Sequence, residues 1–187
     1  MAKTEEEIRA YTIGELKPLT SQIVVVDYDS AWPSLFARED ARIRSILGDR
    51  VRLLEHAGST SVPSLPAKPI IDMILAVPNS ADESAYVPPM EAAGYVLRIR
   101  EPDWFEHRLF KGPDTDVNLH VFPEGCTEID QMLLFRDWLR TNAEERELYA
   151  ANKRELAKRE WRFMQNYADA KTEIVHEILA RARAART

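Results

Sequence analysis

Two hydrophobic periodicities divide the chain into a sheet-forming part and a helical part. Before residue 123, short apolar runs with alternating positions predict six strands. These runs are Ile23–Val26, Val51–His56, Ile70–Val77, Tyr95–Ile99, Phe105–Phe110 and Thr115–Phe122. After residue 127, apolar positions recur at helical spacing and predict three helices, over 129–139, 142–163 and 168–184. The expected fold is α+β, with a mixed sheet, flanking helices and a C-terminal three-helix section.

Helix start and stop signals place three further helices in the first half of the chain. Thr4 and Glu7 form a capping-box pattern, and Gly48 follows an apolar helical stripe at a typical stop position. The predicted helices end near Tyr11, Leu47 and Ala93, and Pro88 and Pro89 interrupt the last of them. We expect residues 1–21 to form an N-terminal extension and residues 22–187 to form one domain.

Composition narrows the function classes. The formal net charge is −6 and the pI is about 5.3, so no basic excess supports binding of duplex nucleic acid. Cys126 is the single cysteine, which excludes an internal disulfide. No apolar signal segment and no run of about 18 apolar residues is visible. We therefore expect a cytoplasmic soluble protein without membrane contact; the sequence leaves the oligomeric state open.

A small polar turn follows the second predicted strand and is the first candidate for chemistry. Gly58, Ser59, Thr60 and Ser61 can offer backbone N–H groups and hydroxyls to an anion. Lys68 follows before the next strand and adds a positive charge, although most serine-rich turns are only turns. The segment predicts a phosphate-binding turn, with an ordinary solvated loop as the alternative.

Asp72 is the one carboxylate in the apolar strand Ile70–Val77, which we expect to be central in the sheet. Alternation places Asp72, Ile74 and Ala76 on one face. A carboxylate there needs a partner, because burial of an unpaired charge is costly. Two interpretations stay open: a structural ion pair with Lys68 or an arginine, and a metal-binding or general-base carboxylate facing a cleft.

The last two predicted strands carry further polar side chains in alternation. Asn118 and His120 share one face of their strand, and Glu106 and Arg108 share one face of the preceding strand. The turn 111–114 joins the two strands as a hairpin, so we expect both polar faces to lie beside Asp72. A solvent-facing strand is the alternative. His107 and His176 are expected to have no special role.

The C-terminal helices repeat one spacing, a tyrosine four residues before a lysine. Tyr149 and Lys153 form the first pair and Tyr167 and Lys171 the second, and residues four apart share a helix face. Together with Arg136, these lysines can meet a phosphate at the sheet, or they can belong to a solvated helix face. Nucleophile-elbow, Walker and zinc-protease motifs are absent from the sequence.

Several separated motifs, in this order, resemble the GrpB family. They are Glu55–Pro63, Ala67–Asp72, Leu119–Val121, Phe135–Arg140 and the two tyrosine–lysine pairs, and the resemblance covers roughly residues 22–183. The family is similar to polymerase-β-like nucleotidyltransferases. The resemblance therefore implies a nucleotidyltransferase-like mixed sheet in which Gly58 and Ser59 match the turn and Asp72 matches the first metal-binding carboxylate. Ile74 stands at the second carboxylate position, and Asn118 or His120 stands at the third.

The resemblance and the residues together predict the site. Asp72 and His120 are the expected catalytic residues, Asp72 is the expected ligand of Mg²⁺ or Mn²⁺, and a nucleotide or other small phosphate compound is the expected partner. The expected phosphate-binding residues are Gly58, Ser59, Thr60, Ser61, Lys68, Arg108, Asn118, Arg136, Lys153 and Lys171. Metal-assisted nucleotidyl or phosphoryl transfer is one expected function. The alternative is a non-catalytic folding-accessory or binding domain, related to the domain fused to dephospho-coenzyme A kinase in some bacteria.

Overall fold

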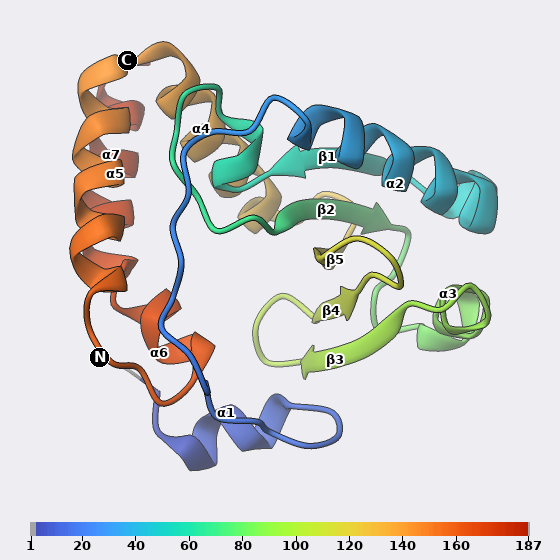
Figure 1. Ribbon diagram of the computed structural model, residues 1–187. Coiled ribbons are helices and arrows are strands. Elements are labelled where there is room, and N and C mark those ends of the chain that lie inside the picture. The colour runs from blue at the N-terminus through green and yellow to red at the C-terminus, as the bar shows by residue number, and fades with distance from the viewer. Residues whose placement is uncertain (1–2, 187) are drawn as a thin grey trace.

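The computed structural model describes residues 3–186, so the first two residues of the predicted extension and the last residue of the predicted domain lie outside it. Its centre is a mixed sheet of five strands in the order β1-β2-β5-β4-β3 (Figure 1). The strands are β1 Leu53–Ala57, β2 Ile71–Val77, β3 Val96–Glu101, β4 His107–Lys111 and β5 Val117–Pro123. β2 and β5 run parallel, and the other neighbouring pairs are antiparallel. The expected α+β fold with a mixed sheet is confirmed.

The helices surround the sheet on both faces and at one end. They are α1 Glu5–Tyr11, α2 Trp32–Leu47, α3 Val87–Ala92, α4 Thr127–Thr141, α5 Ala143–Ala157, α6 Met164–Asp169 and α7 Thr172–Ala184. Helices α2 and α3 cover one face, where the largest apolar cluster gathers. Helix α4 covers part of the other face, where its residue Ile129 lies in one apolar cluster with Phe122 of β5 and with Cys126. Helices α5 and α7 stand at the left in Figure 1, beside the end where β2 begins.

Local signals explain where several elements begin and end. The Thr4 hydroxyl accepts a hydrogen bond from Glu7 N–H, and the Glu7 carboxylate accepts one from Thr4 N–H, so the predicted capping box is present. Gly48 ends α2 with a φ of +53°, which glycine adopts most easily. In the part of the chain that the structure describes, no helix is long and apolar enough to cross a membrane.

Several predicted elements differ from the structure. Residues 23–26 form no strand; Val26 makes an isolated bridge with Ala67, and Ile23 instead packs on α5 and α6. The helix expected from Asp82 is limited to Val87–Ala92, after a 3-10 turn at Glu83–Ala85. Strand β4 starts two residues late, and the predicted helix to 163 ends at Ala157, with a separate short α6 after it.

Candidate functional site

The turn after β1 brings backbone directly against the side chain of Asp72. Gly58 has a φ of +63°, and a 3-10 turn follows at Ser59–Ser61. A Cβ atom on Gly58 would lie 2.3 Å from Asp72 Oδ2, far inside van der Waals contact. Glycine is therefore required twice at this position, for its backbone conformation and for the closeness of the carboxylate.

Among the three hydroxyls in the turn, the Ser59 hydroxyl meets a lysine, and it also has a hydrogen bond with Tyr149. Thr60 Oγ1 lies 3.0 Å from His56 Nε2 and donates to Ile70 O, and the Thr60 side chain is buried. Ser61 Oγ donates to Gly58 O at 2.6 Å and closes the turn. Ser59 Oγ instead accepts a hydrogen bond from Lys153 Nζ at 2.9 Å. Thr60 and Ser61 thus build the turn, and Ser59 faces the lysine.

Asp72 is held by an amide rather than by a cation. Asn118 lies beside it on β5, and Asn118 Nδ2 donates to Asp72 Oδ1 at 2.8 Å. Lys111 Nζ donates to Asn118 Oδ1 at 2.8 Å and so fixes the amide orientation. Among residues 3–186 no Lys or Arg nitrogen forms an ion pair with Asp72. The predicted structural ion pair with Lys68 or an arginine is therefore wrong.

Three lysines from separate parts of the chain gather around this turn. Lys153 of α5 is 3% exposed and also donates to Pro66 O. Lys68, before β2, and Lys171, before α7, lie over the same ring of Tyr167, at 5.3 Å and 4.7 Å from its centroid. The Lys153 ammonium lies 4.8 Å from the centroid of Tyr149. Both tyrosine–lysine pairs of the sequence therefore lie beside the segment that connects β1 to β2.

The protonation of these lysines reflects burial and mutual repulsion. Burial, followed by the charge of Lys171, lowers the pKa of Lys153 to about 7 and that of Lys68 to about 8. Burial also lowers the pKa of Lys171. The charge of Asp72 opposes the shift at all three lysines. Within residues 3–186, none of the three lysines forms an ion pair with a carboxylate, so the site carries more positive than negative charge.

His120 lies on the same face of the sheet as Asp72, next to Ile74 of β2. Its Nδ1 lies 3.0 Å from His107 Nε2, and the two rings are stacked with centroids 5.2 Å apart. His107, for which no special role was expected, therefore contacts one of the predicted site residues. The sequence places His107 two residues before Leu109, so both share one face of their strand, and Leu109 pairs with His120. The missing information was the register of the hairpin.

Three polar residues of the sequence analysis lie away from Asp72 and His120: Arg108, Glu106 and Arg136. Arg108 pairs with Val121, so the expectation that it shares a face with Asn118 and His120 is wrong. Its guanidinium binds Glu83 and Glu106. Glu106 precedes β4 with a φ of +49°. Arg136 is nearly buried and donates to Glu55 Oε2 and His56 O, at 2.7 Å and 3.0 Å, which ties α4 to β1.

The donor set does not fit a two-metal centre. Asp72 is one carboxylate, its Oδ1 accepts from Asn118, and Ile74 fills the position where the resemblance implies a second carboxylate. Across the described part of the chain, no group of three or more His, Cys, Asp or Glu side chains could hold a metal ion. Three lysines beside the carboxylate further disfavour a divalent cation.

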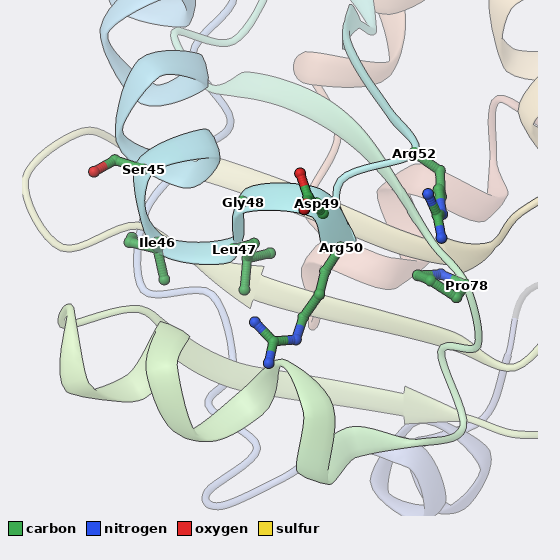
Figure 2. A pocket seen from close by; sticks show the side chains of 8 residues that line it. All are labelled: Ser45, Ile46, Leu47, Gly48, Asp49, Arg50, Arg52 and Pro78. Carbon is green, nitrogen blue, oxygen red and sulfur yellow. The ribbon is translucent and has the colours of Figure 1, made fainter.

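A shallow hollow of about 400 Å³ lies at the opposite end of β2 from Asp72 (Figure 2). It is lined by Ser45, Ile46, Leu47, Gly48, Asp49, Arg50, Arg52 and Pro78. Figure 2 shows Arg50 and Arg52 pointing in different directions, so they offer no joint binding group. Asp72 and Val77 are separated by most of a strand, roughly 17 Å, which places this hollow outside the lysine site.

The sequence is similar to a bacterial protein of matching length and to part of a longer one. It is 61% identical to UPF0157 protein BH1888 of Halalkalibacterium halodurans, over 97% of this chain and 93% of that one. It is 26% identical to a dephospho-CoA kinase of Mycolicibacterium paratuberculosis, over 80% of this chain but only 43% of the kinase.

Solved structures carry the same fold. The conserved protein GrpB from Enterococcus faecalis aligns with a TM-score of 0.75 and 28% identity, over 85% of this chain and 96% of that one. The Cid1 poly(U) polymerase with bound Mg 3′-dATP aligns with a TM-score of 0.55 and 12% identity, over 78% and 49%, which shows likeness of fold alone. The family model described as "GrpB protein" matches residues 22–181. The chain therefore belongs to the GrpB family, and its sheet is of the nucleotidyltransferase-like type.

Proposed function

We propose that this protein binds a phosphate-bearing small molecule of the nucleotide class between the Gly58 turn and Lys68, Lys153 and Lys171. The observation that carries the proposal is the gathering of three partly or fully buried lysines near Asp72, with no ion-pair partner among residues 3–186; Lys153 contacts Ser59, and the other two share the ring of Tyr167. Unpaired buried cations are unfavourable, and an anion with several charges would complement them. A diphosphate or triphosphate group has that charge.

An exposed aromatic side chain favours a nucleotide over inorganic phosphate. Trp104 is 40% exposed, and its ring meets the rings of His107 and Phe122 at 5.0 Å and 5.7 Å. Phe122 lies on the same sheet face as Asp72 and His120. A ring at this place can stack on a base, which typically contributes about 1–3 kcal/mol. The fold of Cid1, whose structure holds 3′-dATP, agrees with this ligand class.

Binding of ligands to purified protein tests the proposal. We expect ATP, pyrophosphate or dephospho-coenzyme A to raise the melting temperature, with about 2.7 kcal/mol of stabilisation at a hundredfold excess over Kd. Lys153→Met should weaken binding at least tenfold, about 1.4 kcal/mol. Lys158→Met is the matched control, since Lys158 is exposed one turn further along the chain. Equal loss in both variants, or no stabilisation by any of these compounds, would reject the proposal.

The role of Asp72 separates metal-dependent binding from binding by the lysines alone. The carboxylate opposes an anion electrostatically, so Asp72→Asn should tighten ligand binding in a buffer with EDTA. A protein-held Mg²⁺ or Mn²⁺ would give the opposite result, because the variant would lose its metal ligand. Calorimetric titration of both proteins with pyrophosphate, with and without Mg²⁺, distinguishes the two.

The relation to dephospho-CoA kinase favours a second candidate, a folding-accessory domain. This chain corresponds to less than half of that kinase, so its relative there is one part of a longer protein. The accessory function predicts that co-expression raises the soluble yield of a dephospho-CoA kinase domain that lacks its GrpB-like part. An unchanged yield would leave ligand binding as the function.

A further inference from the structure

A carboxylate and two imidazoles form a chain of contacts beside the lysine site. His107 Nδ1 lies 2.8 Å from Glu101 Oε2, and His107 Nε2 lies 3.0 Å from His120 Nδ1. His107 is 2% exposed, and its ring stacks on Phe122 at 4.9 Å. The three groups come from β3, β4 and β5, so neighbouring strands hold them in line.

The contacts fix the proton positions when both imidazoles are neutral. Glu101 is an acceptor, because hydrogen bonding to His107 keeps the pKa of its carboxyl below the ordinary value although burial raises it. His107 Nδ1 must then carry the hydrogen, and His107 Nε2 must accept. His120 Nδ1 therefore donates to His107, and His120 Nε2 keeps a lone pair.

His120 lies on the same face of the sheet as Asp72, the carboxylate of the proposed ligand site. His120 is half-buried, and among residues 3–186 no hydrogen-bond partner is seen for its Nε2. It stands two residues along β5 from Asn118, the amide that holds Asp72, or roughly 7 Å. Burial and four charged or titratable groups together bring the pKa of His120 to about 4: burial, His107 and Lys111 lower it, and Asp72 and Glu101 oppose them. The imidazole is thus neutral at pH 7.

We propose that Glu101 and His107 are positioning residues that present His120 Nε2 as the proton acceptor for a hydroxyl group attacking the bound phosphate compound. This rests on the proposed function and narrows it to transfer from a phosphoanhydride to a hydroxyl acceptor. The hydroxyl hydrogen passes to His120 Nε2 as the oxygen forms a bond to phosphorus. The bond from phosphorus to the bridging oxygen breaks, and the leaving phosphate keeps that electron pair beside the lysines. The charge of Glu101 offsets the positive charge that spreads over His120 and His107.

The positions of the protons can be read by ¹⁵N NMR on the free protein. The chain has four histidines, so single substitutions assign every signal. We expect His107 and His120 to carry the hydrogen on Nδ1. In His107→Phe, which keeps a ring but removes the acceptor, the His120 hydrogen should move to Nε2. In His107→Gln, whose amide can both donate and accept, it should stay on Nδ1; the exposed His176→Phe should change nothing at His120.

A hydrogen on His120 Nε2 in the unaltered protein would overturn the inference, as it would mean that His107 carries both protons. Turnover is followed by ³¹P NMR with ATP, where water supplies the hydroxyl group. His120→Gln and His107→Phe should slow release of phosphate or pyrophosphate at least tenfold, and His107→Gln should restore part of it. Bound ATP without turnover by the unaltered protein would reject proton transfer and leave the binding function intact. Absence of ATP binding, with the Nδ1–H signals present, would reject the proposed function instead.

Discussion

Gly58 shows how one residue can be required by its own backbone and by its neighbour. A residue with a Cβ at a positive φ is strained by about 1–2 kcal/mol, and at Gly58 the added carbon also meets the carboxylate of Asp72. The sequence marked the glycine as part of a turn. It gave no sign that Asp72, fourteen residues later, would press against it.

Gly58→Ala should therefore lower the free energy of unfolding more than Gly48→Ala does. Both glycines have similar positive φ, +63° and +53°, but nothing lies within 4 Å of a Cβ on Gly48. We expect a difference of about 1–3 kcal/mol, as for overpacking, measured by urea unfolding. The ligand affinity of Gly58→Ala should also fall, because the turn and Asp72 must separate. Equal costs at the two positions would show that Asp72 gives way without strain.

Lys153 and Lys68 make ligand binding sensitive to pH. Their pKa values of about 7 and 8, lowered chiefly by burial, mean that both are largely neutral in the free protein at pH 9. An anionic ligand favours the charged forms, so binding at pH 8 should take up protons, and affinity should fall as pH rises from 7 to 9. Calorimetry in two buffers of different ionisation enthalpy measures the uptake.

The lowered pKa of Lys153 also determines how the stability of the ligand-free protein changes with pH. The unfolded lysine holds its proton up to its ordinary pKa of 10.5, whereas folded Lys153 loses it near 7. The unfolded state thus binds more protons between these values, and the contribution to stability rises with pH across that window. Lys153→Met should reduce this rise, while Lys158→Met should keep it. A slope unchanged by Lys153→Met would contradict the lowered pKa.

At the scale of elements, strand alternation was predictable but the pairing between strands was not. Asn118 and His120 share a face, as their spacing indicates. The expectation for Arg108 was wrong because of the hairpin register. Lys111 pairs with Asn118, so Arg108, three residues earlier, pairs with Val121 and points to the sheet face that α2 and α3 cover. Phe105 and Glu106, with φ of +54° and +49°, cannot extend β4 backward, which a propensity pattern does not reveal.

Arg108 is expected to support stability and not ligand binding. Its side chain is 5% exposed and donates to Glu83 Oε1 at 2.6 Å, so Arg108→Met should lower the free energy of unfolding by about 2–4 kcal/mol. Arg100 donates to the same oxygen but is 47% exposed, so Arg100→Met should cost less than about 1 kcal/mol. Ligand affinity of the folded Arg108 variant should match the unaltered protein. A weakened ligand affinity would show that Arg108 takes part in ligand binding after all.

At the scale of the whole molecule, the candidate site exists only because the C-terminal helices close on the sheet. Lys153 reaches Ser59 across a sequence separation of 94 residues, and α4, α5 and α7 pack on each other and on the loop after the turn. The N-terminal segment joins this arrangement, since Asn166 Nδ2 donates to Lys3 O and Thr12 bridges to Ile99 of β3.

Ligand binding should therefore protect distant segments together in hydrogen exchange. Pyrophosphate should slow exchange in residues 58–62 and in the parts of α5 and α7 near Lys153 and Lys171. Exchange at the C-terminal end of α2, next to the hollow of Figure 2, should stay unchanged. Protection limited to α5 and α7 would show that the ligand binds the helices without the turn.

The sequence by itself determined most of the local helices and strands of this protein and the side chains that are available for chemistry. Periodicity, caps and turns depend on neighbours within a few residues, so most helices and strands, the Gly58 turn and the two tyrosine–lysine pairs could be predicted. Tertiary structure alone decided which groups meet: Asn118 with Asp72, Lys153 with Ser59, and His107 with His120. The physical reason is that hairpin register and helix docking depend on packing over many residues, and a change of one residue in register moves every side chain to the other face.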